Sequence, residues 1–176
     1  MAAVAEGLDL AVGDVAVYAG HGVARVTVRL SRDIGGEPCG FVVFECSAGL
    51  SITLPLDRAR STLRPVVTET EIRDVRAALR APTSASAENW QRRLRATRTK
   101  IAGGNAVELA EVVRDGNHRV QSLTQRGTPG GLSPNERQLY LKARQLLAAE
   151  LGVSRGLEPA QAEAWIDTQL ATPEDP

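Results

Sequence analysis

The hydrophobic pattern of this chain changes its period once, near Val67, and that change limits the fold more than any other feature. Before it, short runs rich in β-branched residues are separated by glycine-containing turns, which is typical of strands. After it, apolar residues recur every three or four positions, which is typical of amphipathic helices. The sequence therefore predicts an α+β protein, with a small β domain over residues 8–67 and an all-α domain over residues 68–172.

Four short strands are predicted in the first segment, with no helix between them. Such strands, at regular spacing and separated by turns, predict a compact antiparallel barrel. A barrel of roughly 55 residues is near the lower size limit for independent folding, so we expect it to depend on the rest of the chain. The expected strands are Val15–Tyr18, Gly22–Leu30, Gly40–Cys46 and Leu50–Pro55.

Start and stop signals divide the second segment into five expected helices. Thr68 with Glu71 fits a capping box, in which each side chain satisfies the free backbone N–H of the other residue. Pro82 should end that helix, and Gly103-Gly104 should end the next one. The five helices are expected to begin at about Thr68, Ala87, Asn105, Ser133 and Pro159.

The formal net charge of zero conceals a basic middle segment. Residues 68–132 contain eleven Lys and Arg against seven Asp and Glu, whereas residues 1–67 contain six against seven and residues 133–176 contain four against seven. Between positions 80 and 100, six basic residues accompany a single acid, Glu88. Such a patch suits a phosphate backbone, although a solvated helix face is an equally common cause. The six are Arg80, Arg92, Arg93, Arg95, Arg98 and Lys100.

Few residues suggest catalysis, a metal site or a cofactor. His21 and His118 are each without a nucleophile or metal-ligating partner nearby in the sequence, and Cys39 and Cys46 lack the spacing of a zinc site or a disulfide framework. We therefore expect no enzyme activity and two reduced cysteines. No apolar stretch approaches the roughly 20 residues of a membrane helix, and the N-terminus lacks the pattern of a signal peptide, so we expect a cytoplasmic protein.

Several short segments, in order along most of the chain, carry a resemblance to a known family. Each is weakly specific, but their order and spacing together are distinctive. The chain resembles the CarD-type bacterial transcription regulators, whose first domain is shared with transcription-repair coupling factors. The segments are Val12–Tyr18, His21–Ala24, Leu79–Pro82, Glu88–Arg93, Ala110–Asp115 and Leu141–Leu147.

The resemblance implies that the β domain is a Tudor-like barrel that binds the β subunit of RNA polymerase. Arg32 and Ile34 match two positions of the family that face the polymerase. From the sequence pattern alone, Arg32 is simply a charged residue beside a hairpin turn. Thr53 stands where the family usually has arginine, and threonine cannot replace the fork of donors on a guanidinium. We therefore expect weaker polymerase binding, or binding carried more by Arg32 and Ile34.

Trp90 allows two interpretations. On a helix, Trp90, Leu94, Thr97 and Ile101 fall within roughly 60° of one another, which predicts a core residue. The resemblance instead implies that this tryptophan is a wedge inserted into the DNA minor groove at the upstream edge of the promoter bubble. Basic residues of the second and fourth helices would then hold the phosphates without reading sequence. The residues assigned to this DNA contact are Trp90, Arg92, Arg93, Arg95, Arg137 and Lys142.

The expected function is therefore that of a monomeric regulator that binds the polymerase β subunit and promoter DNA, largely without sequence specificity, and stabilises the open complex. One alternative is a protein-protein adaptor, which needs no DNA affinity. Another is a sequence-specific DNA-binding repressor, which needs a recognition helix and usually a dimer. The second expected helix has arginines but no helix-turn-helix signature.

Overall fold

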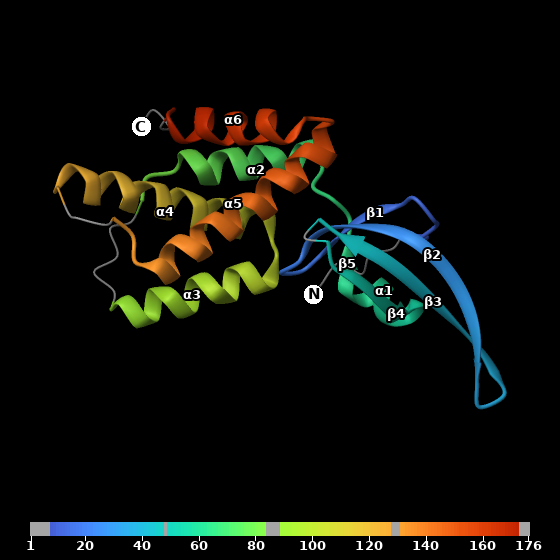
Figure 1. Cartoon of the computed structure of the whole chain (residues 1–176). Helices are drawn as coiled ribbons and strands as arrows, with labels where there is room; N and C mark the ends of the chain where they lie inside the picture. The colour runs from blue at the N-terminus through green and yellow to red at the C-terminus, as the bar shows by residue number, and fades with distance from the viewer. Residues whose placement is uncertain (1–7, 48, 84–88, 128–130, 173–176) are drawn as a thin grey trace. The chain divides into compact units, whose positions relative to one another are not determined.

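The computed structural model describes residues 8–47, 49–83, 89–127 and 131–172. The chain forms two compact units, Met1–Val66 and Val67–Pro176. The first contains an antiparallel sheet and one short helix, and the second is entirely helical (Figure 1). The α+β class and the order of its two parts are thus as the periodicity predicts.

The sheet unit has five strands in the order β4-β3-β2-β1-β5. Each strand runs antiparallel to its neighbour. The strands are β1 (Val15–Tyr18), β2 (Gly22–Ile34), β3 (Glu37–Cys46), β4 (Ser51–Pro55) and β5 (Leu63–Arg64).

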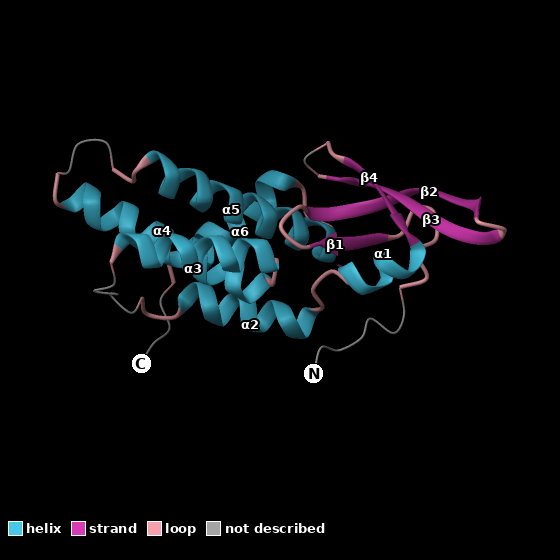
Figure 2. Ribbon diagram, turned by 90° about the horizontal axis from the view of Figure 1, so that it is seen from below, coloured by secondary structure: helices cyan, strands magenta, loops and turns pink. Residues whose placement is uncertain are grey.

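The predicted closed barrel is wrong, because the sheet is open. Among the described residues, β4 and β5 each pair with one strand only. After β4 the chain turns into a helix that the sequence analysis did not predict, α1 (Leu56–Thr62), whose Ala59 is fully buried. A Cβ placed on Gly40 of β3 would lie 3.6 Å from Leu56 Cβ, so α1 packs directly on the sheet. Helix α1 lies along the sheet (Figure 2), with Ala59 in the buried cluster and Leu56 packed against it.

The β2–β3 hairpin is longer than predicted. Its strands run up to Ile34 and resume at Glu37, so a two-residue turn replaces the longer gap expected between Leu30 and Gly40. Gly35 and Gly36 have φ of +67° and +90°, which glycine adopts without the cost that a side chain would add. The Gly36 N–H donates to Asp33 Oδ1 at 2.9 Å. The end of the hairpin therefore has a defined turn although its side chains are exposed.

The inner face of the sheet forms a small core. Phe44 and Val42 are fully buried, and Tyr18 packs edge-on to the Phe44 ring. Both cysteines are free, as expected, with Cys46 buried and Cys39 half-buried. Burial raises the pKa of the Cys46 thiol. The buried residues of this core cluster are Leu10, Ala16, Ala24, Val26, Val42, Phe44, Cys46, Ala59 and Leu63.

The second unit contains the five expected helices among its described residues. The capping box expected at Thr68 is formed, with Glu71 as the returning acid, and Ser133 forms another with Glu136. The Asn105 side chain accepts from two backbone N–H groups at the start of its helix. The expected start at Ala87 lies outside the described residues. The helices are α2 (Glu69–Arg80), α3 (Trp90–Gly103), α4 (Ala106–Gln125), α5 (Pro134–Arg155) and α6 (Pro159–Leu170).

The helical core is assembled mainly from α2, α4, α5 and α6. Val75, Leu147, Leu151 and Ile166 are fully buried in it. Ile101 is the one residue that α3 adds to the buried set. A Cβ on Gly116 of α4 would overlap the ring of Tyr140 on α5, so the missing side chain lets these helices approach closely. Within the described ranges, none of the helices combines the length and apolarity needed to cross a membrane.

Candidate functional site

Helix α3 begins with its aromatic residue and is packed only toward its other end. The Asn89 side chain caps it by accepting from the Gln91 N–H at 3.0 Å, which places Trp90 at the first helical position. Trp90 is 41% exposed, whereas Ile101 on the same stripe is 4% exposed. Leu94 is half-buried. The stripe that predicts a core tryptophan therefore becomes buried gradually, and its first side chain stays in contact with solvent.

The far end of α3 has an ion pair to α4 and a glycine cap within the helix itself. Lys100 Nζ lies 2.6 Å from Glu111 Oε2 of α4, and both side chains are about one-third exposed. Gly104 adopts φ of +66° and donates its N–H to the Lys100 carbonyl, a left-handed cap that glycine adopts readily. This ion pair anchors the end of the helix to α4, and the arginines of α3 precede this anchor.

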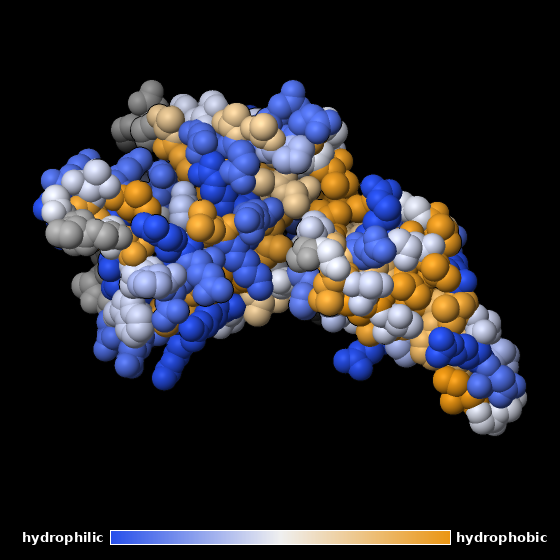
Figure 3. Space-filling view, in the orientation of Figure 1, coloured by the Kyte–Doolittle hydropathy of each residue, from blue (hydrophilic) through white to orange (hydrophobic). Residues whose placement is uncertain are grey.

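The predicted basic residues of α3 differ in exposure. Arg92 and Arg95 are exposed, and Arg93 is half-buried. Figure 3 shows hydrophilic side chains gathered over α3, along the lower edge of the helical unit in that view. A cationic helix face beside an exposed indole can hold phosphates while the ring contacts a base step.

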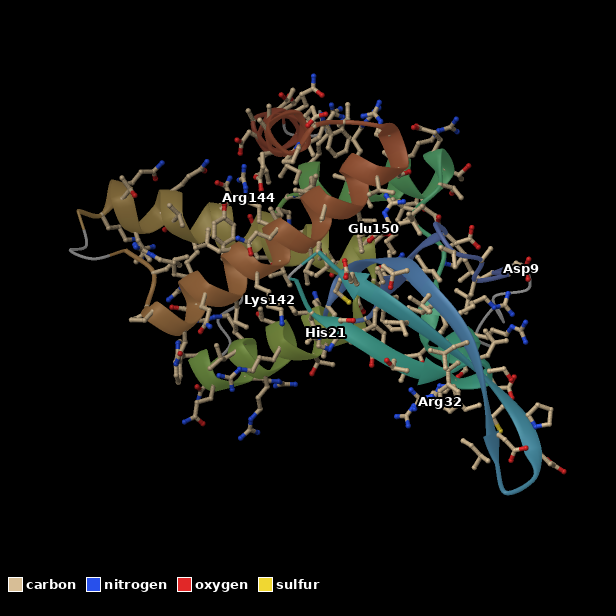
Figure 4. All side chains as sticks on the ribbon, turned by 45° about the vertical axis from the view of Figure 1, so that its right-hand side comes forward. Asp9, His21, Arg32, Lys142, Arg144 and Glu150 are labelled. Carbon is tan, nitrogen blue, oxygen red and sulfur yellow. The ribbon has the colours of Figure 1, made fainter. Side chains whose placement is uncertain are left out.

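Arg137 and Lys142 of α5 are both exposed, and Figure 4 shows Lys142 on that helix. Leu141 lies beside them and is 48% exposed. A groove of about 720 Å³ lies between α3, α4 and α5. Its walls include Arg93, Thr97, Lys100, Asp115, Arg119 and Tyr140. Residues of both α3 and α5 line this groove, so the basic residues of these two helices belong to neighbouring elements of one unit.

Arg144 lies in the segment Leu141–Leu147, which carries part of the family resemblance, but the sequence analysis did not assign it to the site. It donates to Asp167 at 2.7 Å and to Glu163, both on α6, and to the Tyr140 hydroxyl at 3.4 Å. Burial disfavours its charge, but the hydrogen bonds to Asp167, Glu163 and Tyr140 outweigh that effect and raise the pKa of Arg144. This permanent cation ties α5 to α6 and so fixes the helix that carries Arg137 and Lys142.

The three residues assigned to polymerase binding share one face of the sheet. Side chains alternate along a strand, so Arg32 and Ile34 of β2 lie on the same side. The register pairs Arg32 with Cys39 of β3, and Val43 of β3 with Thr53 of β4. Paired residues lie on the same side of a sheet, so Cys39 lies on the side of Arg32. Val43 is an even number of positions from Cys39 on the same strand, so Val43 and its partner Thr53 lie on that side too. This is the face opposite the buried Val42 and Phe44 side chains.

This outer face of the sheet is unusually apolar. Val28 and Ile34 are 45% and 55% exposed, and Phe41 and Val43 are half-buried. The Arg32 guanidinium lies 6.0 Å from the centroid of the Phe41 ring. The apolar run Phe41–Phe44 could have revealed this face, because a strand with one solvated face normally alternates. Its apolar part consists of Val28, Leu30, Ile34, Cys39, Phe41, Val43 and Pro55, and the polar residues Arg32, Glu37, Glu45, Ser51 and Thr53 share the face.

Titratable residues do not converge into a metal site in the described part of the chain, where no group of three or more His, Cys, Asp or Glu could hold an ion. His21 stacks on Tyr18 with ring centroids 4.9 Å apart, and its side chain is exposed. His118 lines the groove of the helical unit.

Comparison with known proteins identifies the family. The family model for the CarD C-terminal domain matches residues 74–167, which includes α3, α4, α5 and most of α2 and α6. A Bacillus subtilis (strain 168) protein named "Putative transcription factor YdeB" is 24% identical over 156 residues. That alignment covers 88% of this chain and 97% of the relative, so it extends into the sheet unit. Because the family model alone matches more than half of the sequence, the chain belongs to the CarD family.

Proposed function

We propose that this protein is a transcription regulator that binds the β subunit of RNA polymerase and stabilises the open promoter complex. Residues 8–67 would bind the polymerase and residues 68–172 would contact DNA at the upstream edge of the bubble. The observation that carries the proposal is the exposed Trp90 at the start of an arginine-rich helix. An unpaired apolar ring is costly to expose to water, and a junction where base stacking is already lost offers it a partner.

The outer face of the sheet supports the polymerase half of the proposal. A contiguous apolar surface on a soluble protein commonly marks a protein-protein interface. Arg32 stands within that surface and supplies the charge that orients a partner. Thr53 offers one hydroxyl in place of a guanidinium, so the apolar side chains and Arg32 would supply most of the affinity.

No chemical step is needed for this activity. Binding to polymerase raises the effective concentration of Trp90 and its neighbouring arginines at the bubble, so weak DNA contacts become sufficient. If these contacts form only in the open complex, they shift the equilibrium between closed and open complexes toward the open one. The size of the shift is set by the difference in binding free energy between the two complexes. A difference of about 1.4 kcal/mol shifts it tenfold.

A gel-shift comparison tests the proposed function. The full-length protein is titrated onto a linear duplex and onto a forked promoter fragment, with and without RNA polymerase. We expect weak binding to DNA alone, preference for the fork, and a strong increase in occupancy when polymerase is present. Binding to polymerase without any contribution from DNA would indicate an adaptor. Tight binding to one linear sequence without polymerase would indicate a sequence-specific repressor.

Two further measurements separate the two interfaces. Arg32→Glu should weaken capture of the polymerase β subunit, because charge reversal makes an attractive contact repulsive. DNA affinity should fall with salt, with a log-log slope of about −0.9 for each phosphate neutralised. A folded Arg32→Glu protein that binds as wild type does would remove Arg32 from the interface, and salt-insensitive binding would point to another partner for the basic helix.

A further inference from the structure

The backbone of Val67, the first residue of the helical unit, is held on both sides by side chains of α5. Its N–H donates to Glu150 Oε1 at 3.0 Å, and its carbonyl accepts from the Ser154 hydroxyl. Its side chain is 5% exposed and belongs to the helical core. Glu150 and Ser154 are four positions apart, so they project from the same face of α5. Figure 4 labels Glu150 on this helix.

The identity of Glu150 needs an explanation beyond core packing. It is 1% exposed, and a carboxylate is rarely buried so completely because removing its charge from water is costly. An apolar residue of similar size would pack there without that cost, but it would leave the Val67 N–H without its acceptor. One function of the carboxylate is therefore to bind the backbone of the connecting segment.

That connecting segment is short. Only Pro65, Val66 and Val67 separate Arg64, the last residue of β5, from Thr68, the cap of α2. Proline fixes its own φ, and Thr68 is held by its capping box. Val67 is thus bound at both its N–H and its carbonyl, and Thr68 by its capping box, at the point where the segment enters the helical unit.

We propose that Glu150 and Ser154 are positioning residues, here called the Val67 clamp, that restrict the directions in which the connecting segment leaves the helical unit. The inference rests on the proposed function, in which one unit binds polymerase and the other contacts DNA. A restricted connection keeps the DNA-contacting residues in a smaller volume than a free one, which raises their effective concentration at the bubble. The clamp thus affects the coupling of the two contacts and neither contact alone.

Ser154→Ala tests the clamp directly, because it removes the donor to the Val67 carbonyl. Thr168→Ala is a matched control, since the Thr168 hydroxyl bonds to the Ala164 carbonyl within α6. For each full-length protein, affinity for the polymerase β subunit, affinity for forked DNA and open-complex lifetime are measured. We expect Ser154→Ala to keep both affinities and to require roughly threefold more protein for half-maximal extension of the lifetime. Thr168→Ala should behave as wild type in all three.

A Gly-Ser insertion between Pro65 and Val66 provides a second test that leaves both clamp bonds in place. It should reproduce the Ser154→Ala effect without lowering the melting temperature, because it adds freedom outside the helical core. If both variants extend the lifetime as wild type does at the same concentration, the clamp has no coupling role and the inference is wrong. If wild type itself leaves the lifetime unchanged, the proposed function fails instead.

Discussion

Helices α3 and α6 of the helical unit each carry a tryptophan on their apolar stripe, yet they place it differently. Trp165 of α6 is half-buried and packs against the helical core, beside the buried Ile166. The guanidinium groups of Arg76 and Arg155 lie 5.9 and 5.6 Å from its ring centroid. Trp90 of α3 lies outside the buried cluster, at the end of the helix farthest from its anchor.

The difference shows that periodicity identifies a stripe but not the length over which the stripe is packed. Helix α6 has buried residues from Ala162 to Gln169, whereas only Ile101 is buried on α3. An indole within the packed part of a stripe stabilises the fold, and one beyond it is free to bind something else. If this view is correct, substitutions on α6 should affect stability, and those at the start of α3 should affect function.

The largest loss of stability is expected from Ile166→Ala. Ile166 is fully buried in the helical core, so truncation removes buried apolar surface and leaves a cavity. We expect the free energy of unfolding to fall by about 2–5 kcal/mol, measured by denaturant titration. A loss under about 1 kcal/mol would mean that α6 is less important to the core than its burial indicates.

Trp165→Ala should have a smaller but clear effect. The variant loses half-buried aromatic surface and two cation–π contacts, so we expect a loss of about 1–3 kcal/mol, below that of a fully buried aromatic residue. Thermal unfolding measures it, with Trp165→Phe as the control that keeps a ring between Arg76 and Arg155. If Trp165→Ala is as stable as wild type, Trp165 does not stabilise the fold, and the proposed difference between α6 and α3 is wrong.

The ion pair that anchors α3 should contribute less to stability than the Trp165 side chain does. Lys100 and Glu111 are each about one-third exposed, so solvent screens their attraction. A double-mutant cycle with Lys100→Ala and Glu111→Ala should give a coupling of about 0.5 kcal/mol that shrinks at high salt. A coupling that is large and insensitive to salt would show that α3 is held more firmly than its exposure indicates.

The sequence predicted the parts of the fold that local chemistry determines. The capping box at Thr68, the helix start at Ser133, the Gly103-Gly104 stop and strand β1 follow from residues within one turn of the feature they form. Helix α1 and the open sheet were missed, because Leu56–Thr62 is short and its formation depends on packing against the sheet.

The candidate site was predictable only in its residue types. The exposure of Trp90 depends on how far α3 packs along its neighbours, which no pattern within α3 records. The shared face of Arg32 and Thr53 follows from the pairing of three strands, a non-local property. The Val67 clamp joins residues more than eighty positions apart, so neither the buried Glu150 nor Ser154 could have been assigned from spacing.

Trp90→Ala should have a small effect on stability and a large effect on function. Its side chain is 41% exposed and lies outside the core, so the free energy of unfolding should fall by about 1 kcal/mol or less, below the loss expected for Trp165→Ala. Capture of the polymerase β subunit should persist, because the outer face of the sheet is unchanged. The open-complex lifetime should fall toward the value measured without the protein, since the ring that contacts the bubble edge is gone.

Trp90→Phe is the control that separates loss of stacking from loss of structure. A smaller flat ring can still stack, so this variant should retain part of the extension of the open-complex lifetime. Thermal unfolding and lifetime are measured on the same preparations of all three proteins. A clear drop in melting temperature for Trp90→Ala, with normal lifetime from the folded fraction, would contradict the comparison. Trp90 would then stabilise the fold as Trp165 does, and the arginines of α3 would be the remaining evidence for DNA contact.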